Sequence, residues 1–544
     1  MRLSNFFTIQ VLRQSLPENR WNKYFKSLTT PILILIVLIA IFLRFFLFTS
    51  VPSGINPDEA DAGYEAYSLL QNGTDKWGNK WPSYFISWGS GQNVLESYLD
   101  IPVIYVGGLN SFTIRLIPAA LGVLAVAMLY YVLKLYDTTV ALVGSFGLAI
   151  LPWAVMSSRW GLESNILPFF ILFGLFSFIF ARRSRYRKYL IPLSLIPFVI
   201  ALYAYIISLF VIPIVLLGTL IIYRREVLTD KLSYTFSLII AFIVSIPIDV
   251  FIVENYVLHR IPRFAKHLPF SAPLLLQSRL AQINGQANGN LLWANLHFYT
   301  SGFVDIYPWA NMDGFTPALI YLPLAVIGAV LAFKGANKMF KIFAVWFIAN
   351  FILSFVVPLD DIRANTFIIP LIALSALTVV TVVKNCSLER KMLSLIIAIM
   401  LIGYSIFFYV DYFINYNQQN NTGSFYFNTG FDQALQQARK LAHNTTDIYV
   451  SDSINLNYVY TLFYLKADSK DFQRYSDYSI VKSYGSTMFK VNNYRNYYFY
   501  PTNPELQGEP YVYILKSGDT IECKKMETTY SKTVWRVGIC TPSS

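Results

Sequence analysis

Carboxylates gather at the start of one predicted helix, in the segment NPDEADAGYEAYSLL at residues 56–70. Asn56 is a favourable N-cap, Pro57 suits the first helical position, and Glu59 lies three residues after the cap, where it completes a capping box. Asp58 lies in the same first turn. A carboxylate held in place can act as a general base that takes a proton from a hydroxyl group. Acidic residues are also favoured in the first turn of any helix, because its free N–H groups carry partial positive charge, so the pattern by itself leaves both interpretations open.

The composition indicates what kind of protein must position these carboxylates. Of the 544 residues, 55% are hydrophobic and 17% aromatic, only 14% are charged, and the mean hydropathy is +0.46. These values differ from those of a soluble domain and predict a polytopic α-helical membrane protein. The formal net charge is +12, but most basic residues form short clusters between apolar runs, where orientation in the bilayer explains them. We therefore expect no nucleic-acid partner.

Eleven apolar runs are long enough to cross a hydrocarbon core of roughly 30 Å. The first follows a polar and basic segment that does not resemble a cleaved signal peptide, so we expect it to be a retained anchor in the cell membrane. The runs cover approximately residues 31–48, 113–135, 138–157, 164–181, 188–204, 206–223, 232–251, 316–333, 340–357, 362–383 and 392–412.

Basic residues predict the orientation of these spans, because positive charge gathers in cytoplasmic connections. With the N-terminus inside, every basic cluster falls in an inner connection: Lys134; residues 182–188; Arg224, Arg225 and Lys231; Lys334, Lys338 and Lys341; and Lys384, Arg390 and Lys391. This orientation requires that residues 94–108 do not cross the membrane. That segment is too short and too polar to do so, since it carries Glu96, Asp100 and Pro102. We therefore expect the carboxylates near Asp58 to face the outside of the cell.

The predicted topology divides the chain into three parts. These are a cytoplasmic N-terminus at residues 1–30, a transmembrane domain at 31–412, and an extracytoplasmic C-terminal domain at 413–544. Two outer loops are long, at residues 49–112 and 252–315. The first should hold two helices that lie in the membrane interface, at 56–70 and 94–108, with Trp77, Trp81 and Trp88 at the level of the lipid headgroups.

The C-terminal domain combines a predicted helix at residues 431–442 with predicted strands at 447–452, 511–518 and 534–540. It is therefore expected to be a small α/β or α+β domain. Cys523 and Cys540 both fall in it. On the outer side of the membrane oxidation is permitted, so a disulfide and two free thiols both remain open.

Other polar residues are predicted at the outer ends of the spans, on the same side as Asp58. They are Arg159 and Glu163 in SRWGLES, Tyr203 and Tyr205 after the fifth span, and Asp360, Asp361 and Arg363 in PLDDIRAN. Each one alone could be a solvated anchor. Together they are what a site at the edge of the bilayer needs, where one end of a substrate lies in lipid and the other in water.

A sugar carried on a polyprenyl phosphate would suit such a site. Its leaving group is a phosphate monoester with a second pKa near 6, which departs without a protonating acid. The acceptor hydroxyl needs a base, which a carboxylate supplies, and arginines would stabilise the departing phosphate. The chain has no D-x-D sequence to hold a nucleotide-bound metal, so we expect no nucleotide cofactor.

In these features the chain resembles the GT-C glycosyltransferases, in particular the group of protein O-mannosyltransferases and the lipid A aminoarabinose transferase. The resemblance covers residues 31–412 and rests on four motifs in order: NPDEADAGYEAYSLLQNG followed by WP, FTIRLIPAALG, SRWGLES, and DDIRANTFIIPLIAL. It implies a cavity open to the outer leaflet, a polyprenyl-phosphate sugar donor, and inverting transfer.

The resemblance also implies roles for individual residues. Asp58 matches the catalytic base, with Glu59 beside it, while Arg159, Glu163 and Arg363 match positions that contact donor or acceptor. Two departures concern the donor contacts. Many relatives have a Lys/Pro-Pro-Leu segment where this chain has SGQNVLESYL, so either Gln92 or Glu96 replaces that contact or it is missing. The aminoarabinose enzyme has a lysine where this chain has Tyr205.

Several alternatives stay open at this stage. A flippase or transporter of lipid-linked sugars, or a ligase or polymerase of lipid-linked glycans, would also need a membrane-embedded site. The acceptor in the cell envelope could be a protein, a glycolipid or a polysaccharide. A divalent metal is open as well, because Asp58, Glu59 and Asp61 could hold one or work without it.

Overall fold

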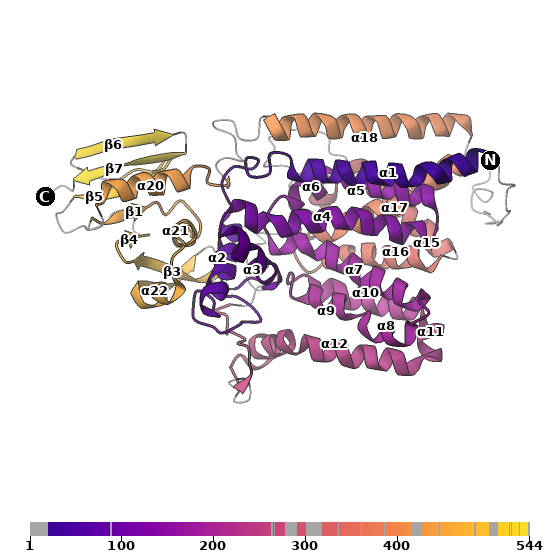
Figure 1. The fold of residues 1–544 in the computed structure, drawn as a ribbon, viewed down its shortest axis with the longest axis horizontal. Coiled ribbons are helices and arrows are strands. Elements are labelled where there is room, and N and C mark those ends of the chain that lie inside the picture. Colours follow the sequence, from indigo (N-terminus) through magenta and orange to yellow (C-terminus); the bar gives the residue numbers. More distant parts are fainter. Residues whose placement is uncertain are drawn as a thin grey trace.

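The computed structural model of the chain is a bundle of helices with a sheet domain at one end (Figure 1). It describes residues 20–87, 90–262, 265, 267–277, 291–300, 318–335, 337–360, 362–385, 387–414, 426–443, 446–483, 486–499, 510–521, 523, 525–532 and 534–541. Trp88 and Asp361 lie outside these ranges. The helices of the bundle are α1 (Arg20–Phe45), α4 (Ser111–Lys134), α5 (Thr138–Ile150), α6 (Pro152–Ser158), α7 (Glu163–Arg183), α8 (Arg187–Leu193), α9 (Ile196–Leu202), α10 (Ser208–Ile222), α11 (Arg224–Thr229), α12 (Lys231–Ile252), α14 (Leu291–Thr300), α15 (Ala318–Lys334), α16 (Lys338–Leu353), α17 (Ile368–Asn385) and α18 (Leu388–Ile414).

Each of the eleven predicted spans contains helix, but their number as membrane crossings stays a prediction. Among the described residues, six helices are long and apolar enough to cross a membrane: α1, α4, α7, α12, α17 and α18. The pair α5 and α6, bent by 58°, would make a seventh. Pro152 explains the bend, because it disfavours helical backbone at the preceding residue, and Leu151 has an extended ψ of 118°. The other four predicted spans form shorter or interrupted helices: α8 with α9, α10, α15 and α16.

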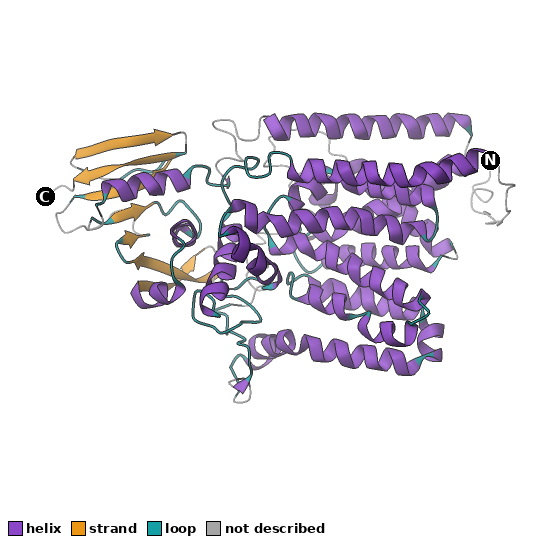
Figure 2. Cartoon of the chain, viewed as in Figure 1, coloured by secondary structure: helices purple, strands orange, loops and turns teal. Residues whose placement is uncertain are grey.

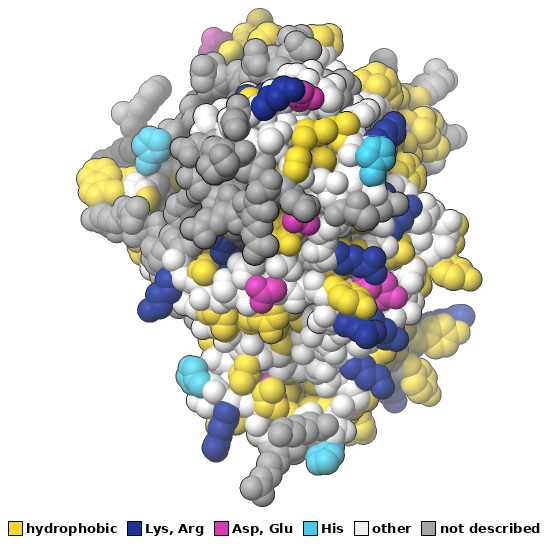
Figure 3. Space-filling model, turned by 90° about the vertical axis from the view of Figure 1, so that its left-hand side faces the viewer, with side chains coloured by type: hydrophobic (Ala, Val, Ile, Leu, Met, Phe, Trp, Pro, Cys, Tyr) yellow, Lys and Arg dark blue, Asp and Glu magenta, His cyan; other side chains and the backbone are white. Residues whose placement is uncertain are grey.

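The outward faces of the bundle are apolar. On α18, for example, Leu395, Ile399 and Phe407 are all at least 60% exposed. Water-soluble proteins rarely expose such continuous apolar surface, so these faces are suited to lipid. The end of the molecule that carries the sheet domain is different, since charged side chains are interspersed with the apolar ones there (Figure 3). This contrast supports a multi-pass membrane protein.

Two helices, α2 (Pro57–Asn72) and α3 (Leu95–Gly107), lie between the bundle and the sheet domain (Figure 1). The predicted capping box is confirmed: the Asn56 side chain accepts from the N–H of Asp58 at 2.9 Å, and the N–H of Asn56 donates to Glu59 at 2.8 Å. Gly73, at a φ of +67°, ends α2 in the left-handed conformation that glycine adopts easily. The helix predicted at residues 94–108 is present as α3, with 13 residues.

The C-terminal domain is a mixed seven-stranded sheet in the order β2-β3-β4-β1-β5-β7-β6. Strand β1 pairs in parallel with β4 and β5, and the other pairs are antiparallel. The predicted helix and strands of this domain are all present. The elements are α20 (Phe431–Leu441), β1 (Ile448–Val450), α21 (Asn457–Leu465), α22 (Ser469–Tyr475), β2 (Ser476–Ser483), β3 (Ser486–Tyr494), β4 (Tyr497–Tyr498), β5 (Tyr511–Lys516), β6 (Lys525–Lys532) and β7 (Trp535–Thr541).

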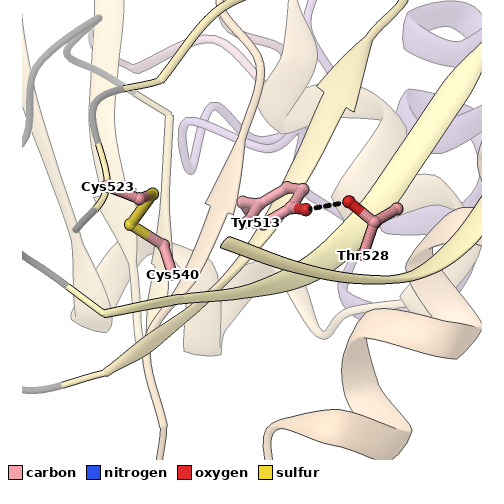
Figure 4. The surroundings of a disulfide bond; sticks show 4 residues. All are labelled: Tyr513, Cys523, Thr528 and Cys540. Atoms are coloured by element: carbon pink, nitrogen blue, oxygen red, sulfur yellow. Dashed lines mark hydrogen bonds between the residues drawn. A yellow bond between two sulfur atoms is a disulfide. The ribbon is translucent and has the colours of Figure 1, made fainter. Parts of the chain in front are cut away.

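Cys523 and Cys540 form a disulfide that ties the segment before β6 to β7 (Figure 4). In the same region the hydroxyl groups of Tyr513 on β5 and Thr528 on β6 lie 2.8 Å apart, although β7 lies between these strands. Gly538 on β7 makes this possible, because a Cβ there would lie 2.5 Å from the Tyr513 hydroxyl. The two links join three strands at this end of the sheet.

The sheet domain and helix α2 share one hydrophobic core. Ala60, Tyr64 and Ala66 of α2 belong to the same buried cluster as Val459 of α21 and Trp535 of β7. Helices α21 and α22 of the C-terminal domain therefore pack directly on α2 (Figure 2). Helix α2 is held from two sides, by the bundle and by the sheet domain.

Candidate active site

A cavity of about 470 Å³, counting the part open to solvent, lies where five segments meet. These are the start of α2, the loop after it, the start of α7, the segment between α9 and α10, and the segment before α17. Its lining is formed by Asp58, Ser87, Gly91, Gln92, Leu162, Glu163, Ser164, Tyr205, Asp360, Ile362 and Arg363. Five of the seven residues that the sequence proposes as a site are therefore brought together: Asp58, Gln92, Glu163, Tyr205 and Arg363.

Asp58 lies in the first turn of α2 and is half-buried, with its side chain at the cavity. Both polar groups of its backbone are hydrogen-bonded. The N–H group donates to the Asn56 cap, and the carbonyl accepts from the Gln92 side chain at 3.3 Å. The carboxylate is thus held at a defined place on the wall of the cavity, as a positioned base requires.

Glu163 is the first residue of α7, and its buried side chain lines the cavity. The N–H group of Asn93 donates to it at 2.6 Å, which joins the loop after α2 to α7. The start of a helix favours a negative charge, because the free N–H groups there are partly positive. Tyr205, also buried, adds a hydroxyl group to the lining.

Arg363 is the basic residue among those that line the cavity. Its guanidinium donates to the carbonyl of Pro358 at 3.0 Å and lies 3.1 Å from the Asp360 carboxylate. The N–H of Arg363 also donates to Asp360, at 2.7 Å. These contacts hold the guanidinium while leaving it at the cavity surface, where it can bind an anionic group.

Glu59 and Arg159 do not line the cavity. The Glu59 carboxylate is buried and accepts two bonds from Arg115 of α4, at 2.7 and 2.9 Å, and one from the N–H of Gly161 at 2.8 Å. Arg159 is buried too, and donates to four backbone carbonyls at and just after the end of α1. The last carbonyls of a helix have no partner within it, so Arg159 caps α1. We therefore assign both side chains to the architecture of the site.

A buried ionic cluster behind the cavity was not predicted from the sequence. Lys76 binds both Asp61 and Glu65 of α2, and Ser87 donates to Asp61 at 2.5 Å. Burial raises the pKa of Glu65 to about 8, because one lysine cannot fully compensate two carboxylates. Burial alone would lower the pKa of Lys76, but the two carboxylates outweigh that effect and raise it well above its usual value. The available signal was the spacing of Asp61 and Glu65, one helical turn apart, on a helix followed by Lys76.

This cluster and the contacts of Glu59 bear on the metal that the sequence left open. Glu59 is bound to Arg115 and Asp61 to Lys76, so the two neighbours of Asp58 on α2 each have a cationic partner already. In the described ranges, no three side chains of His, Cys, Asp or Glu are arranged to hold a metal ion.

Two further carboxyl groups, Glu96 and Asp100 on α3, are wholly buried next to the site. None of their four oxygens has a hydrogen-bond partner within the described part of the chain. Burial, together with the charges of Asp100, Glu163 and Glu59, raises the pKa of Glu96 well above its usual value, and burial does the same for Asp100. Burial therefore favours the neutral form of both carboxyl groups. Glu96 does not line the cavity, so of the two substitutes proposed for the missing donor contact only Gln92 is in place.

Comparison with known proteins identifies the fold that carries this cavity. Residues 98–250 match the family model described as dolichyl-phosphate-mannose-protein mannosyltransferase. No curated protein matches the chain by sequence.

The structure of ArnT from Cupriavidus metallidurans bound to undecaprenyl phosphate is similar over 95% of this chain and 98% of that one, with 13% identity and a TM-score of 0.57. The oligosaccharyltransferase AglB from Archaeoglobus fulgidus, in complex with an inhibitory peptide and a dolichol-phosphate, is similar over 81% of this chain and 64% of that one, with 14% identity and a TM-score of 0.52. The chain thus has the GT-C fold of the protein O-mannosyltransferase and ArnT type, as the sequence motifs predicted.

Proposed function

We propose that this chain is an inverting glycosyltransferase that moves a sugar from a polyprenyl-phosphate carrier to an acceptor hydroxyl group on the outer face of the cell membrane. The observation that carries the proposal is the cavity itself. It gathers Asp58, Glu163 and Arg363 from three distant parts of the chain, in a fold shared with a protein whose structure holds undecaprenyl phosphate.

Asp58 is the proposed catalytic base. The acceptor oxygen attacks the anomeric carbon of the sugar from the face opposite the phosphate, and the bond from that carbon to the phosphate oxygen breaks as the new bond forms. The proton of the acceptor hydroxyl passes to the Asp58 carboxylate, and the bonding electrons leave with polyprenyl phosphate. Because a phosphate monoester has a second pKa of about 6, this leaving group needs no proton. A positioned base of this kind typically contributes about 10²- to 10⁴-fold in rate.

Arg363 is the proposed contact for the donor phosphate. Two negative oxygens of a phosphate match the planar fork of a guanidinium, and Asp360 orients that fork. Glu163, Tyr205 and Gln92 face the same space and offer acceptors and donors to sugar hydroxyl groups.

The shape of the molecule supports the predicted orientation. The start of α1 and the sheet domain lie at opposite ends of the bundle, and α2, with the carboxylates, lies at the sheet end (Figure 1). If the N-terminus is cytoplasmic, the cavity and the C-terminal domain are extracytoplasmic. The lipid chain of the donor would then lie along the apolar bundle while its phosphate reaches the cavity.

The test is transfer of labelled sugar by the purified full chain in lipid nanodiscs. Radiolabelled polyprenyl-phosphate sugars are incubated with cell-envelope fractions, and the fraction that takes up label identifies the acceptor class. We expect transfer by the natural sequence and transfer about 10²- to 10⁴-fold slower by Asp58→Asn, while Asp452→Asn, which changes an exposed aspartate of the sheet domain, serves as the matched control. Transport of the carrier across vesicle membranes without transfer of sugar would favour a flippase instead.

A further inference from the structure

The sheet domain contacts the chain immediately before the residue proposed as the base. The Tyr460 hydroxyl of α21 donates to the carbonyl of Ile55 at 3.0 Å and accepts from the Asn428 side chain at 2.7 Å. The Thr429 hydroxyl donates to the carbonyl of Ser53 at 2.7 Å. Asn56, the cap of α2, comes directly after Ile55. The position at which α2 begins is therefore set by side chains about 400 residues later in the sequence.

Tyr460 is suited to this contact because it is buried and keeps its proton. Burial, with smaller contributions from Glu59 and Asp58, raises the pKa of its hydroxyl well above the usual value. The hydroxyl is thus a permanent donor to the Ile55 carbonyl.

A second contact joins the sheet domain to another part of the cavity wall, the loop after α2. The Trp77 ring, in the loop after α2, lies among four aromatic rings of the sheet domain, with centroid distances of 5.2 to 6.4 Å: Tyr458, Phe472, Tyr478 and Phe489. Its indole N–H donates to the carbonyl of Ile86 at 3.1 Å. Ser87, which follows Ile86, lines the cavity, as do Gly91 and Gln92. Trp77 therefore links the sheet domain to this wall.

The loop between Trp77 and the cavity is held firmly to α2. Lys76, next to Trp77, binds Asp61 and Glu65, and Ser87 binds the same Asp61. Both cavity walls, the start of α2 and the loop after it, are thus fixed relative to each other and to the sheet domain.

We propose that the sheet domain holds the cavity in its working shape, and that Tyr460 and Trp77 are positioning residues for the transfer reaction. The inference rests on the proposed function, because it assigns Asp58 and Gln92 as the groups being positioned. Neither Tyr460 nor Trp77 touches the cavity in the lining described above. Displacing reacting groups by about 1 Å can cost roughly 10²-fold in rate, so a contact outside the cavity can control turnover.

The matched pair Tyr460→Phe and Tyr64→Phe tests this proposal. Both hydroxyl groups are buried and donate to a backbone carbonyl across the same interface, since Tyr64 donates to Ala467 at 3.0 Å. Tyr64, however, lies almost two turns of helix beyond Asp58. We expect Tyr460→Phe to lower kcat by about tenfold or more with KM for the donor changed by less than about threefold, and Tyr64→Phe to leave kcat within about twofold. Equal effects of the two variants on kcat would overturn the proposal.

Two further measurements keep the test decisive. Hydrogen exchange of the backbone amides at residues 55–60 should be faster in Tyr460→Phe than in the natural sequence and unchanged in Tyr64→Phe; unchanged exchange in both variants would overturn the proposal without any activity assay. Trp77→Phe retains an aromatic ring but loses the N–H donor, and it should lower kcat without changing the binding of undecaprenyl phosphate. If the natural sequence transfers no sugar, the proposed function fails, while the exchange experiment still tests the positioning.

Discussion

The wall of the cavity and the buried layer behind it contain the same kinds of residues and use them differently. Asp58 and Glu59 are neighbours on α2, yet Asp58 is half-buried at the cavity while Glu59 is enclosed by Arg115 and the N–H of Gly161. Likewise Arg363 lies at the cavity surface, whereas Arg115 is buried and all three nitrogens of its guanidinium donate to acceptors of the protein. A charged side chain that is enclosed by hydrogen-bond partners stabilises the fold, whereas one that lines a cavity can bind a substrate or react.

The largest expected effect is on the cavity side of this comparison. Asp58→Asn keeps the shape of the side chain and the hydrogen bonds of the Asp58 backbone but removes the base, so transfer should fall by about 10²- to 10⁴-fold. The unfolding temperature should stay close to that of the natural sequence, because the cap of α2 belongs to Asn56. Initial rates of label transfer and a thermal unfolding curve check both statements. Near-normal rates would remove Asp58 as the base.

The next effect is on the buried side. Glu59→Gln leaves Arg115 buried without a carboxylate, and breaking a buried ion pair by removing one partner costs about 3–5 kcal/mol. We therefore expect a large loss of stability, seen as a lower unfolding temperature or a lower yield of folded protein, with Asp58→Asn as the control at the adjacent position. If Glu59→Gln were fully stable and inactive, the two acids would have exchanged roles.

The protonation of the buried layer gives a third prediction. In the folded protein the pKa of Glu96 is raised by burial, whereas in the unfolded chain it is close to 4.3. Above that value the folded state binds more protons than the unfolded one, so the free energy of unfolding falls as the pH rises, by at most about 1.4 kcal/mol per pH unit for one group. Glu65, with a pKa of about 8, adds to this slope up to that pH.

Glu96→Gln should therefore make stability less dependent on pH between 6 and 8, and Asp452→Asn, which changes an exposed aspartate of the sheet domain, should not. Denaturant unfolding of both variants at several pH values measures these slopes. A slope identical to that of the natural sequence in Glu96→Gln would show that Glu96 is ionised in the folded protein.

The sequence was most informative where local chemistry decides the structure. The cap at Asn56, the short helix at residues 94–108 and the strands of the C-terminal domain follow from neighbouring residues, and all are present. Which polar residues line the cavity and which only support the fold could not be predicted from the sequence. The structural role of Glu59 is set by its bond to Arg115, which lies 56 residues away in the sequence. The role of Arg159 is set by carbonyls at the end of α1, more than 100 residues away. Local motifs identify a charged residue as unusual, but its partner in the fold decides what it does.

The smallest expected effect compares the two arginines directly. A lysine keeps the charge of Arg363 but loses the planar fork, so Arg363→Lys should raise KM for the polyprenyl-phosphate donor by about tenfold, or about 1.4 kcal/mol, with little change in stability. In the buried layer we expect Arg115→Lys to lower the stability of the protein and to leave KM for the donor nearly unchanged. Its guanidinium bonds to Glu59 through two nitrogens and to the carbonyls of Pro52 and Gly54, and a single ammonium cannot reach all of these acceptors. Donor titrations and unfolding curves on both variants separate the outcomes. If Arg363→Lys lowered stability and left KM unchanged, Arg363 would belong to the architecture, and the donor phosphate would need another partner in the cavity.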